Sequence, residues 1–386
     1  MSTGRTDPAR PIAPPTAEAL RAAFDAPEPL TVGLEEELML LQPGTLHLAP
    51  LGSDVIAALE GDPRFKLELP ASQLEIVTSP APDVPTAIRE LAGARVHLAA
   101  RAEGIARPAG AAVHPFSATE GELNADERYR RTAREFGRYA NRQLVCALQV
   151  HVAIGDADRA LAVHNALRSY LPQLAALAAA APFHGGRDTG LASVRPKISE
   201  ELPRQGVPPP IDSWEDLAGA FGWGAASGVV PEPAVWWWEL RPHPRWGTLE
   251  LRVPDTQATV ADAGAVAALA HSVIGWLAER HERGEELGHD PSWRIEENRW
   301  SACRYGVEGT LADLRTGERL PTRARLRALI DAVAPTAARL GCAGQLEHAR
   351  SLAERNGAMR MREVAADGGV EAVAAWLADR FVEDLE

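Results

Sequence analysis

The sequence predicts an α+β fold in which strands with one polar face are interleaved with long helices. First, several short segments alternate between apolar and polar residues, which is the period of a half-buried strand. Second, longer segments repeat apolar residues with the period of a helix, and they dominate the chain beyond about residue 291. Third, strands and helices do not alternate regularly and no G-x-G-x-x-G motif follows a strand, which argues against a parallel βαβ architecture.

The first half of the chain is expected to contain most strands of the sheet. Residues 1–15 are polar and rich in proline, and we expect a flexible arm ahead of a single domain at 16–386. Asp83 or Thr86, and Asp156, are suitable N-caps for two long helices. In order, we expect a helix at 17–24, strands at 31–41, 66–69 and 73–78, a helix from 83 to 106, a strand at 110–114, a helix at 126–139, a strand at 144–154 and a helix from 156 to 180.

The second half is expected to be mostly helical. Residues 182–210 are rich in Gly, Pro, Arg and Ser without clear periodicity, so we expect a long functional loop there. Ser213 caps a short helix to about residue 221, and strands are expected at 234–240 and 248–253. The remaining helices are expected at 262–282, 293–305, 323–340, 345–356 and 370–385.

Composition and charge exclude several classes of protein. Of the 386 residues, 46% are hydrophobic and 24% are charged, which is ordinary globular usage. The net charge is −13, so we expect no binding to nucleic acid or to anionic membranes. The three cysteines are far apart, and neither a signal peptide nor a run of 18 apolar residues occurs, so we expect a reduced, cytoplasmic protein. Lysine occurs only as Lys66 and Lys197, which leaves arginine to hold any phosphate group.

Four of the predicted strands place charged or amide side chains on one face. Side chains at i and i+2 share a face of a strand, so each of these strands has an apolar face and a polar one. The polar pairs are Glu35 with Glu37, Gln73 with Glu75, Gln149 with His151, and Glu250 with Arg252. Glu36 is expected to point to the opposite side.

This polar face has two interpretations. A solvent-facing surface is common in antiparallel sheets, but it usually mixes lysine, serine and threonine, whereas these pairs contain only Glu, Gln, His and Arg. Carboxylates on one face repel each other unless cations lie between them. Mg²⁺ prefers oxygen ligands, which it shares with substrate phosphates. The pattern therefore favours a metal–carboxylate site on one face of the sheet.

Five motifs in order give the chain a family resemblance. They are G-L-E-E-E-L at 33–38, S-Q-L-E-I-V-T at 72–78, P-F-H-G-G-R-D-T-G-L-A-S at 182–193, W-W-E-L-R-P at 237–242 with G-T-L-E-L-R-V-P-D at 247–255, and E-N-R-W at 297–300 with R-Y-G at 304–306. Together they resemble the YbdK-type glutamate–cysteine ligases (glutamate–cysteine ligase family 2), which are carboxylate–amine ligases of the glutamine synthetase superfamily. The resemblance covers residues 31–309 and continues weakly to the end.

The resemblance implies a fold and a chemistry. The fold would be a curved, largely antiparallel sheet of the glutamine synthetase and guanido kinase type, with a concave polar active-site face and helices on its back. ATP, with Mg²⁺ or Mn²⁺, would phosphorylate a carboxylate, and an amine would then displace phosphate to form an amide. Glutamate would be the acyl donor and cysteine a candidate acceptor. A homodimer is implied only at the level of the family.

The resemblance also implies roles for individual residues. The implied metal ligands are Glu35, Glu37, Glu75, Glu250 and, where the family has a histidine, Gln149. Arg252 would stabilise the migrating phosphoryl group, with Arg195 and Arg241 as further catalytic candidates. The implied nucleotide-binding residues are His151, Arg187, Ser193, Asn298 and Arg299. Structural ion pairs are the alternative interpretation of Arg187, Arg195 and Arg241.

Gln149 leaves an alternative function open. A glutamine offers one carbonyl oxygen where the family has an imidazole nitrogen, so the chain could be an attenuated relative that binds nucleotide or amino acid without efficient turnover. A metal hydrolase is a third option, although such sites usually contain more histidine ligands. The intact glutamates and Arg252 favour the ligase.

Overall fold

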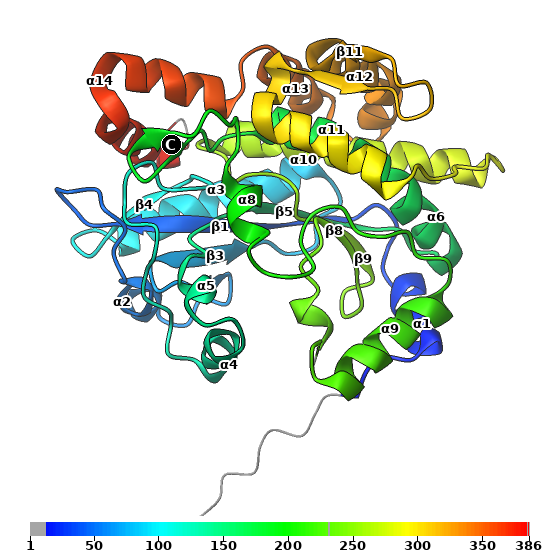
Figure 1. The fold of residues 1–386 in the computed structure, drawn as a ribbon, viewed down its shortest axis with the longest axis horizontal. Coiled ribbons are helices and arrows are strands. Elements are labelled where there is room, and N and C mark those ends of the chain that lie inside the picture. The colour runs from blue at the N-terminus through cyan, green and yellow to red at the C-terminus, as the bar shows by residue number, and fades with distance from the viewer. Residues whose placement is uncertain (1–12, 231, 384, 386) are drawn as a thin grey trace, which may run out of the picture.

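The computed structural model describes residues 13–230, 232–383 and 385 (Figure 1). The helices are α1 (Ala17–Asp25), α2 (Gly52–Ala58), α3 (Val84–Arg101), α4 (Glu127–Phe136), α5 (Arg138–Asn141), α6 (Ala157–Leu167), α7 (Leu171–Ala178), α8 (Arg195–Ser199), α9 (Trp214–Ser227), α10 (Val260–Glu282), α11 (Ser292–Tyr305), α12 (Thr322–Arg339), α13 (Ala343–Glu354) and α14 (Gly357–Asp379). Most of the predicted arm lies outside the described residues.

A seven-stranded antiparallel sheet forms the centre of the fold. Its strands are β1 (Val32–Leu41), β2 (Phe65–Leu67), β3 (Gln73–Val77), β4 (Arg107–Ala109), β5 (Leu148–Ala153), β8 (Leu240–His243) and β9 (Thr248–Leu251). The order is β2-β3-β1-β5-β9-β8, and β4 pairs with the end of β1. The central pairs β1–β5 and β5–β9 therefore join distant parts of the chain, whereas β2–β3 and β8–β9 are neighbours in sequence.

Helices cover the apolar face of this sheet. Helix α10 contacts β5, α3, α6, α12 and α13, and Figure 1 shows α3 and α10 on the same side of the sheet. Leu34 and Leu38 of β1 and Val150 of β5 are buried in this core. Among the described helices, α10 alone is long and apolar enough to cross a membrane, but 89% of that apolar stretch is buried inside the fold, as in a core helix.

One ion pair interrupts the apolar back of the sheet. Glu36 points away from the polar face, as its position in β1 predicts, and its carboxylate is fully buried. Arg95 of α3 donates to both of its oxygens at 2.6 and 2.8 Å, and also to the carbonyls of Gln257 and Phe381. The pair therefore joins the sheet, α3 and the C-terminal end of the chain.

Local sequence signals explain where several elements begin and end. The Asp83 carboxylate accepts from the Thr86 amide at 2.7 Å and caps α3, and Asp156 caps α6 in the same way. The long helix predicted from 156 to 180 is wrong as one element, because it breaks at a 3₁₀ turn before α7. Pro172 lies in the first turn of α7, where its missing amide hydrogen costs nothing.

Other predictions of local structure were displaced or incomplete. The strand expected at 110–114 is β4, three residues earlier, and the strand expected at 234–240 is a 3₁₀ turn that starts at Pro233, with β8 beginning only at Leu240. The loop at 182–210 contains a small hairpin, β6 (Phe183–His184) with β7 (Arg187–Asp188), and α8. Helix α2 and the hairpin of β10 (Thr310–Ala312) and β11 (Arg319–Pro321) were not predicted.

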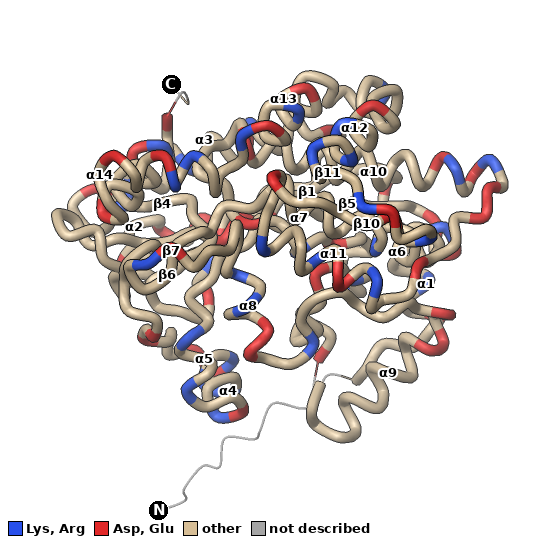
Figure 2. The backbone as a smooth tube through the Cα atoms, turned by 45° about the horizontal axis from the view of Figure 1, so that its top comes forward, with Lys and Arg blue, Asp and Glu red and all other residues tan. Residues whose placement is uncertain are grey.

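The helical C-terminal region is present from α11 onward. Helix α14 begins at Gly357 rather than near residue 370, and it is kinked at Gly369, where φ is 78°. Figure 2 shows positions of both charges interspersed along α4 and along the C-terminal helices. Ion pairs such as that between Arg327 and Glu354 lie on these exposed faces.

Candidate active site

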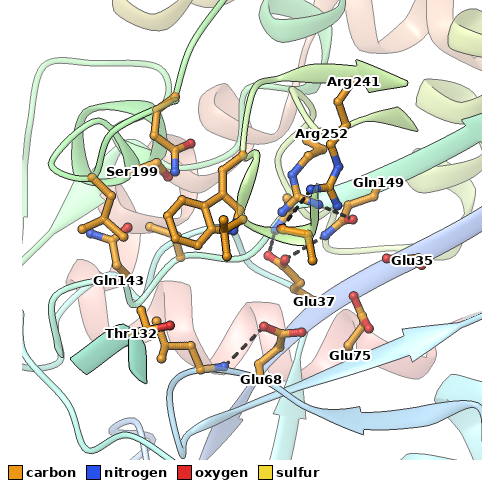
Figure 3. A pocket seen from close by; sticks show the side chains of 18 of the residues that line it. Glu35, Glu37, Glu68, Glu75, Thr132, Gln143, Gln149, Ser199, Arg241 and Arg252 are labelled. Carbon is orange, nitrogen blue, oxygen red and sulfur yellow. Dashed lines mark hydrogen bonds between the residues drawn. The ribbon is translucent and has the colours of Figure 1, made fainter. Parts of the chain in front are cut away.

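The polar face of the sheet forms the floor of a cavity of about 570 Å³. Residues of β1, β3 and β5, with Arg252 directly after β9, line one end, where Figure 3 shows Glu35, Glu37, Glu75, Gln149 and Arg252 together. Figure 3 places Thr132, Gln143 and Ser199 at the other end, on the α4, pre-β5 and α8 segments. The cavity therefore joins this carboxylate-rich end, called the charged end below, to a second polar end, where Arg131 and Glu200, the chain neighbours of Thr132 and Ser199, also contribute to the lining.

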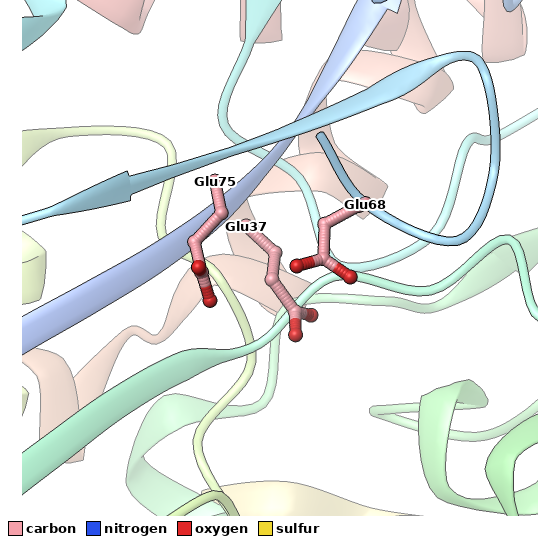
Figure 4. Close-up of side chains that lie close together, drawn as sticks. All are labelled: Glu37, Glu68 and Glu75. Carbon is pink, nitrogen blue, oxygen red and sulfur yellow. The ribbon is translucent and has the colours of Figure 1, made fainter. Parts of the chain in front are cut away.

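Three carboxylates meet at the charged end (Figure 4). Glu37 and Glu75 are direct partners across β1 and β3, and Glu68 follows β2. One oxygen from each lies within 4.8 Å of the others. Burial, reinforced by Glu37, raises the pKa of Glu68 to about 7. Burial, together with Glu68 and Glu35, raises the pKa of Glu75 well above its ordinary value. Such a cluster is unfavourable without a cation between its members.

Glu37 is also held by donors from β5 and the segment before it. The Ala147 amide donates to one carboxylate oxygen at 2.7 Å, and the Gln149 side-chain nitrogen donates to the other at 2.9 Å. The Gln149 oxygen accepts from Arg252 Nη1 at 2.7 Å. Burial nevertheless raises the pKa of Glu37, against the lowering effect of Arg252.

Glu250 faces two arginines and is fully buried. Arg241, its partner across β8 and β9, donates to both oxygens at 2.5 and 3.2 Å, and Arg252 donates to one at 2.5 Å. Although burial acts to raise its pKa, these arginines hold the pKa of Glu250 well below its ordinary value. Arg241 also donates through Nη1 to two backbone carbonyls, so each of its three side-chain nitrogens has a partner in the protein.

Arg252 differs from Arg241 in having donors to spare. Its two hydrogen bonds to described residues both use Nη1, one to Gln149 and one to Glu250. Within the described part of the chain, its Nε and Nη2 have no partner, and the side chain lines the cavity. These N–H groups can therefore bind an anion that enters the site.

His151 and Glu35 form a second polar pair beside the carboxylate cluster. His151 Nδ1 lies 3.0 Å from the Thr248 hydroxyl, while its Nε2 lies 3.7 Å from a Glu35 oxygen. That Nε2 is buried without a hydrogen-bond partner among the described residues. A buried nitrogen in this state is suited to a ligand atom placed between the two side chains.

Arg195 and Ser193 belong to a buried hub around Asp255. The Asp255 carboxylate accepts from Arg195 Nε at 2.7 Å, from the Ser193 hydroxyl at 3.0 Å and from the Ala180 amide at 2.8 Å. Arg195 also donates to the carbonyls of Arg252 and Val253 while it lines the cavity. The hub thus fixes the backbone that carries Arg252.

The residues expected to bind nucleotide do not line the cavity; they are His151, Arg187, Ser193, Asn298 and Arg299. Arg299 donates to both oxygens of Glu239 at 2.6 to 3.0 Å, and the Asn298 amide group bonds both backbone groups of Ala312. Arg187 is exposed in the β6–β7 hairpin. The geometry therefore gives Arg299 and Asn298 structural contacts and keeps Arg187 apart from the charged end.

Several cavity residues were missed by sequence reasoning. Glu68 had a signal, because it follows Lys66 by two residues on a predicted strand and so shares its face. Thr132, Gln143 and Ser199 had none, since their positions depend on how the segments around α4 and α8 fold over the sheet. Trp237 also lines the cavity, whereas Trp236 packs edge-on against Phe221 with 4.6 Å between ring centroids.

Comparison with known proteins gives consistent matches over most of the chain. The model of the family described as glutamate-cysteine ligase family 2 matches residues 31–375. The chain is 37% identical over 368 residues to "Putative glutamate--cysteine ligase 2-3" of Rubrobacter xylanophilus, covering 93% of this chain and 99% of the relative. It is 32% identical over 367 residues to "Putative glutamate--cysteine ligase 2" of Clavibacter michiganensis, covering 92% and 94%.

Solved structures share the fold at low sequence identity. A glutamate–cysteine ligase from Francisella tularensis, solved in complex with AMP, matches with a TM-score of 0.67 and 11% identity, covering 92% of this chain and 89% of that one. A bifunctional glutathione synthetase from Pasteurella multocida matches with a TM-score of 0.61 and 15% identity, covering 95% and 54%. These likenesses confirm the predicted α+β fold with its largely antiparallel sheet and helical C-terminal region.

Proposed function

Because the chain belongs to glutamate–cysteine ligase family 2, which makes it an ATP-dependent carboxylate–amine ligase, we propose that it activates the γ-carboxylate of glutamate and joins it to the amino group of cysteine. The family predicted from the five ordered motifs is thereby confirmed. The AMP bound to the Francisella tularensis ligase supports ATP as the nucleotide. The names of the relatives support glutamate and cysteine as the substrates.

The single observation that carries this proposal is that a carboxylate cluster lies at the same end of the cavity as Arg252, whose Nε and Nη2 have no partner among the described residues. Glu37, Glu68 and Glu75 lie at one end of the cavity, and Arg252 lines the same end. Phosphoryl transfer requires alignment and neutralisation of charge more than covalent help. This end of the cavity offers anionic oxygens for a cation and N–H groups for a phosphoryl group.

The residues fit a divalent cation. Three carboxylates that repel one another, with raised pKa values, and the unpartnered His151 Nε2 are arrangements that a bound cation would relieve. Glu37, Glu68 and Glu75 would hold Mg²⁺, with Glu35 beside them. A bound Mg²⁺ would supply positive charge that offsets the negative charge of the ATP phosphates. Glu250, held by two arginines, is better suited to fixing Arg252 than to metal binding.

Different residues along the cavity would bind the phosphoryl group and the amino acids. The free Nε and Nη2 of Arg252 would hold the phosphoryl group as it moves from ATP to the γ-carboxylate. The amine then attacks the acyl phosphate, phosphate leaves, and an amide forms. Gln143, Ser199 and Trp237, which line the cavity away from the charged end, would contact the amino acids. The intact carboxylates and Arg252 do not favour a relative that binds without turnover.

Release of ADP from ATP tests the proposal. With Mg²⁺, glutamate and cysteine, we expect ADP to form together with a product of the mass of γ-glutamylcysteine. Other amines in place of cysteine would define the range of acceptors. Glu37→Gln should abolish ADP release, whereas Glu103→Gln, an exposed position, should not. ADP release that does not depend on glutamate would contradict the proposal.

The expected homodimer, cytoplasmic location and lack of binding to nucleic acid or membranes stay predictions. Gel filtration of the pure protein tests the first of these. Measurements with duplex DNA and with anionic vesicles test the last.

A further inference from the structure

Gln149 lies in the middle of a continuous chain of polar contacts that crosses the floor of the cavity. Its side-chain nitrogen donates to Glu37 at 2.9 Å, and its oxygen accepts from Arg252 Nη1 at 2.7 Å. Arg252 Nη1 also donates to Glu250, and Arg241 on the neighbouring strand β8 donates to the same carboxylate. Gln149 is only 2% exposed, so water has little access to its amide.

We propose that Gln149 is a positioning residue that couples Glu37 to Arg252, and that it does not bind the metal ion. This inference rests on the proposed function, because it concerns the residues expected to hold metal and phosphate there. It revises the role that the sequence resemblance implied for this position.

The Gln149 amide is oriented with its nitrogen toward Glu37 and its oxygen toward Arg252. Oxygen is the only atom of a glutamine side chain that binds Mg²⁺ or Mn²⁺, and here it faces a guanidinium group. The nitrogen, which cannot bind a cation, faces Glu37 and therefore the carboxylate cluster. Turning the amide over would bring two donors together at Arg252 and two acceptors together at Glu37. Both hydrogen bonds, each to a charged group, would be lost.

Gln149 also holds Arg252 in a way that leaves two of its nitrogens free. Gln149 and Glu250 together occupy both hydrogens of Nη1, which fixes the plane of the guanidinium group. The Nε and Nη2 groups remain without a partner among the described residues, on a side chain that lines the cavity. A glutamine that holds one side of this group sets the direction in which the other side binds phosphate. Loss of Gln149 should therefore misplace Arg252 without removing a metal ligand.

Binding of Mn²⁺ in the absence of ATP separates positioning from metal binding. Gln149→Met keeps the length of the side chain and removes both hydrogen bonds. We expect its Kd for Mn²⁺, from the electron paramagnetic resonance signal of free Mn²⁺, to stay within twofold of wild type. Glu75→Gln should raise that Kd at least tenfold, and Gln42→Met, at an exposed position, should change nothing. A Kd raised as much by Gln149→Met as by Glu75→Gln would overturn the inference.

Turnover tests the positioning role. We expect Gln149→Met to lower kcat at least tenfold and to change the KM for ATP less than threefold, because the contact of Arg252 matters most as the phosphoryl group moves. An unchanged kcat would also overturn the inference. If the wild type itself does not use glutamate, the proposed function fails, while the Mn²⁺ comparison still tests Gln149.

A second measurement uses the wild-type protein and does not depend on the folding of a variant. Anomalous scattering from crystals soaked in Mn²⁺ locates the ion directly. We expect it among Glu37, Glu68 and Glu75, and farther from the Gln149 oxygen than a coordination bond allows. An ion bonded to that oxygen would refute the inference.

Discussion

Replacing Glu68 with glutamine should stabilise the metal-free protein and weaken its binding of metal. Burial and the charge of Glu37 raise the pKa of Glu68 from 4.5 to about 7, so the folded state resists ionisation of this group. Below about pH 4.5 the group is protonated in both states and has no effect. Between pH 4.5 and 7 it ionises only in the unfolded state, so stability falls as the pH rises. Above about pH 7 the destabilisation of the folded state by Glu68 has reached its full size.

The size of the effect follows from the same shift. A difference of about 2.5 pKa units corresponds to about 3 kcal/mol, at about 1.4 kcal/mol per unit. The entropy of unfolding is about 2.1 cal/mol/K per residue, or about 0.8 kcal/mol/K for 386 residues. Glu68→Gln should therefore raise the Tm by about 4 °C at pH 8 in a chelator, and by about 1 °C at pH 5.

Thermal unfolding followed by tryptophan fluorescence measures both arms of this prediction. Adding Mg²⁺ should reverse the order of the two proteins, because the variant has lost one anionic ligand and gains less stability from the cation. Glu103→Gln, which is exposed, is the matched control. A gain in Tm of equal size at pH 5 and pH 8, or a variant that is less stable than wild type in the chelator, would refute the reasoning.

Three further predictions concern residues around the sheet. Arg95→Met should lower the free energy of unfolding by about 3–5 kcal/mol, because it leaves Glu36 charged and buried, and the double variant with Glu36→Leu should recover much of that loss; denaturant unfolding measures both. Arg252→Lys should lower kcat while changing the KM for ATP little, since lysine lacks the planar fork; a rise in KM alone would place the contact in the ground state. Ser193→Ala should leave the KM for ATP within about twofold, because its hydroxyl is used by Asp255, and steady-state kinetics would reveal a direct nucleotide contact as a much larger rise.

The alternation of polar and apolar residues was sufficient to predict the polar face of the sheet. Glu35, Glu37, Glu75 and Gln149 line the cavity as their positions in the strands require, and Glu36 lies on the opposite side. This worked because side-chain direction in a strand follows from position alone, and because one face is buried against helices.

The pattern could not predict how deeply each side chain is buried or which groups it contacts. Glu250 lies on the polar face of β9, but its partner across β8 is Arg241. The pairing of the two strands therefore places an arginine on the Glu250 carboxylate. Likewise, Arg299 and Asn298 lie in a motif that resembles the family, yet their contacts are with Glu239 and Ala312. Motifs identify residues that matter, but only tertiary contacts separate binding groups from supporting ones.

Transfer of oxygen from the substrate carboxylate to phosphate tests the central claim most directly. Glutamate labelled with ¹⁸O in its γ-carboxylate is incubated with the enzyme, ATP, Mg²⁺ and cysteine, and the released phosphate is analysed by mass spectrometry. If an acyl phosphate forms at the cavity, one labelled oxygen should appear in the phosphate for each amide made. Phosphate that carries no label while amide accumulates, or label that appears without any amide product, would contradict the account.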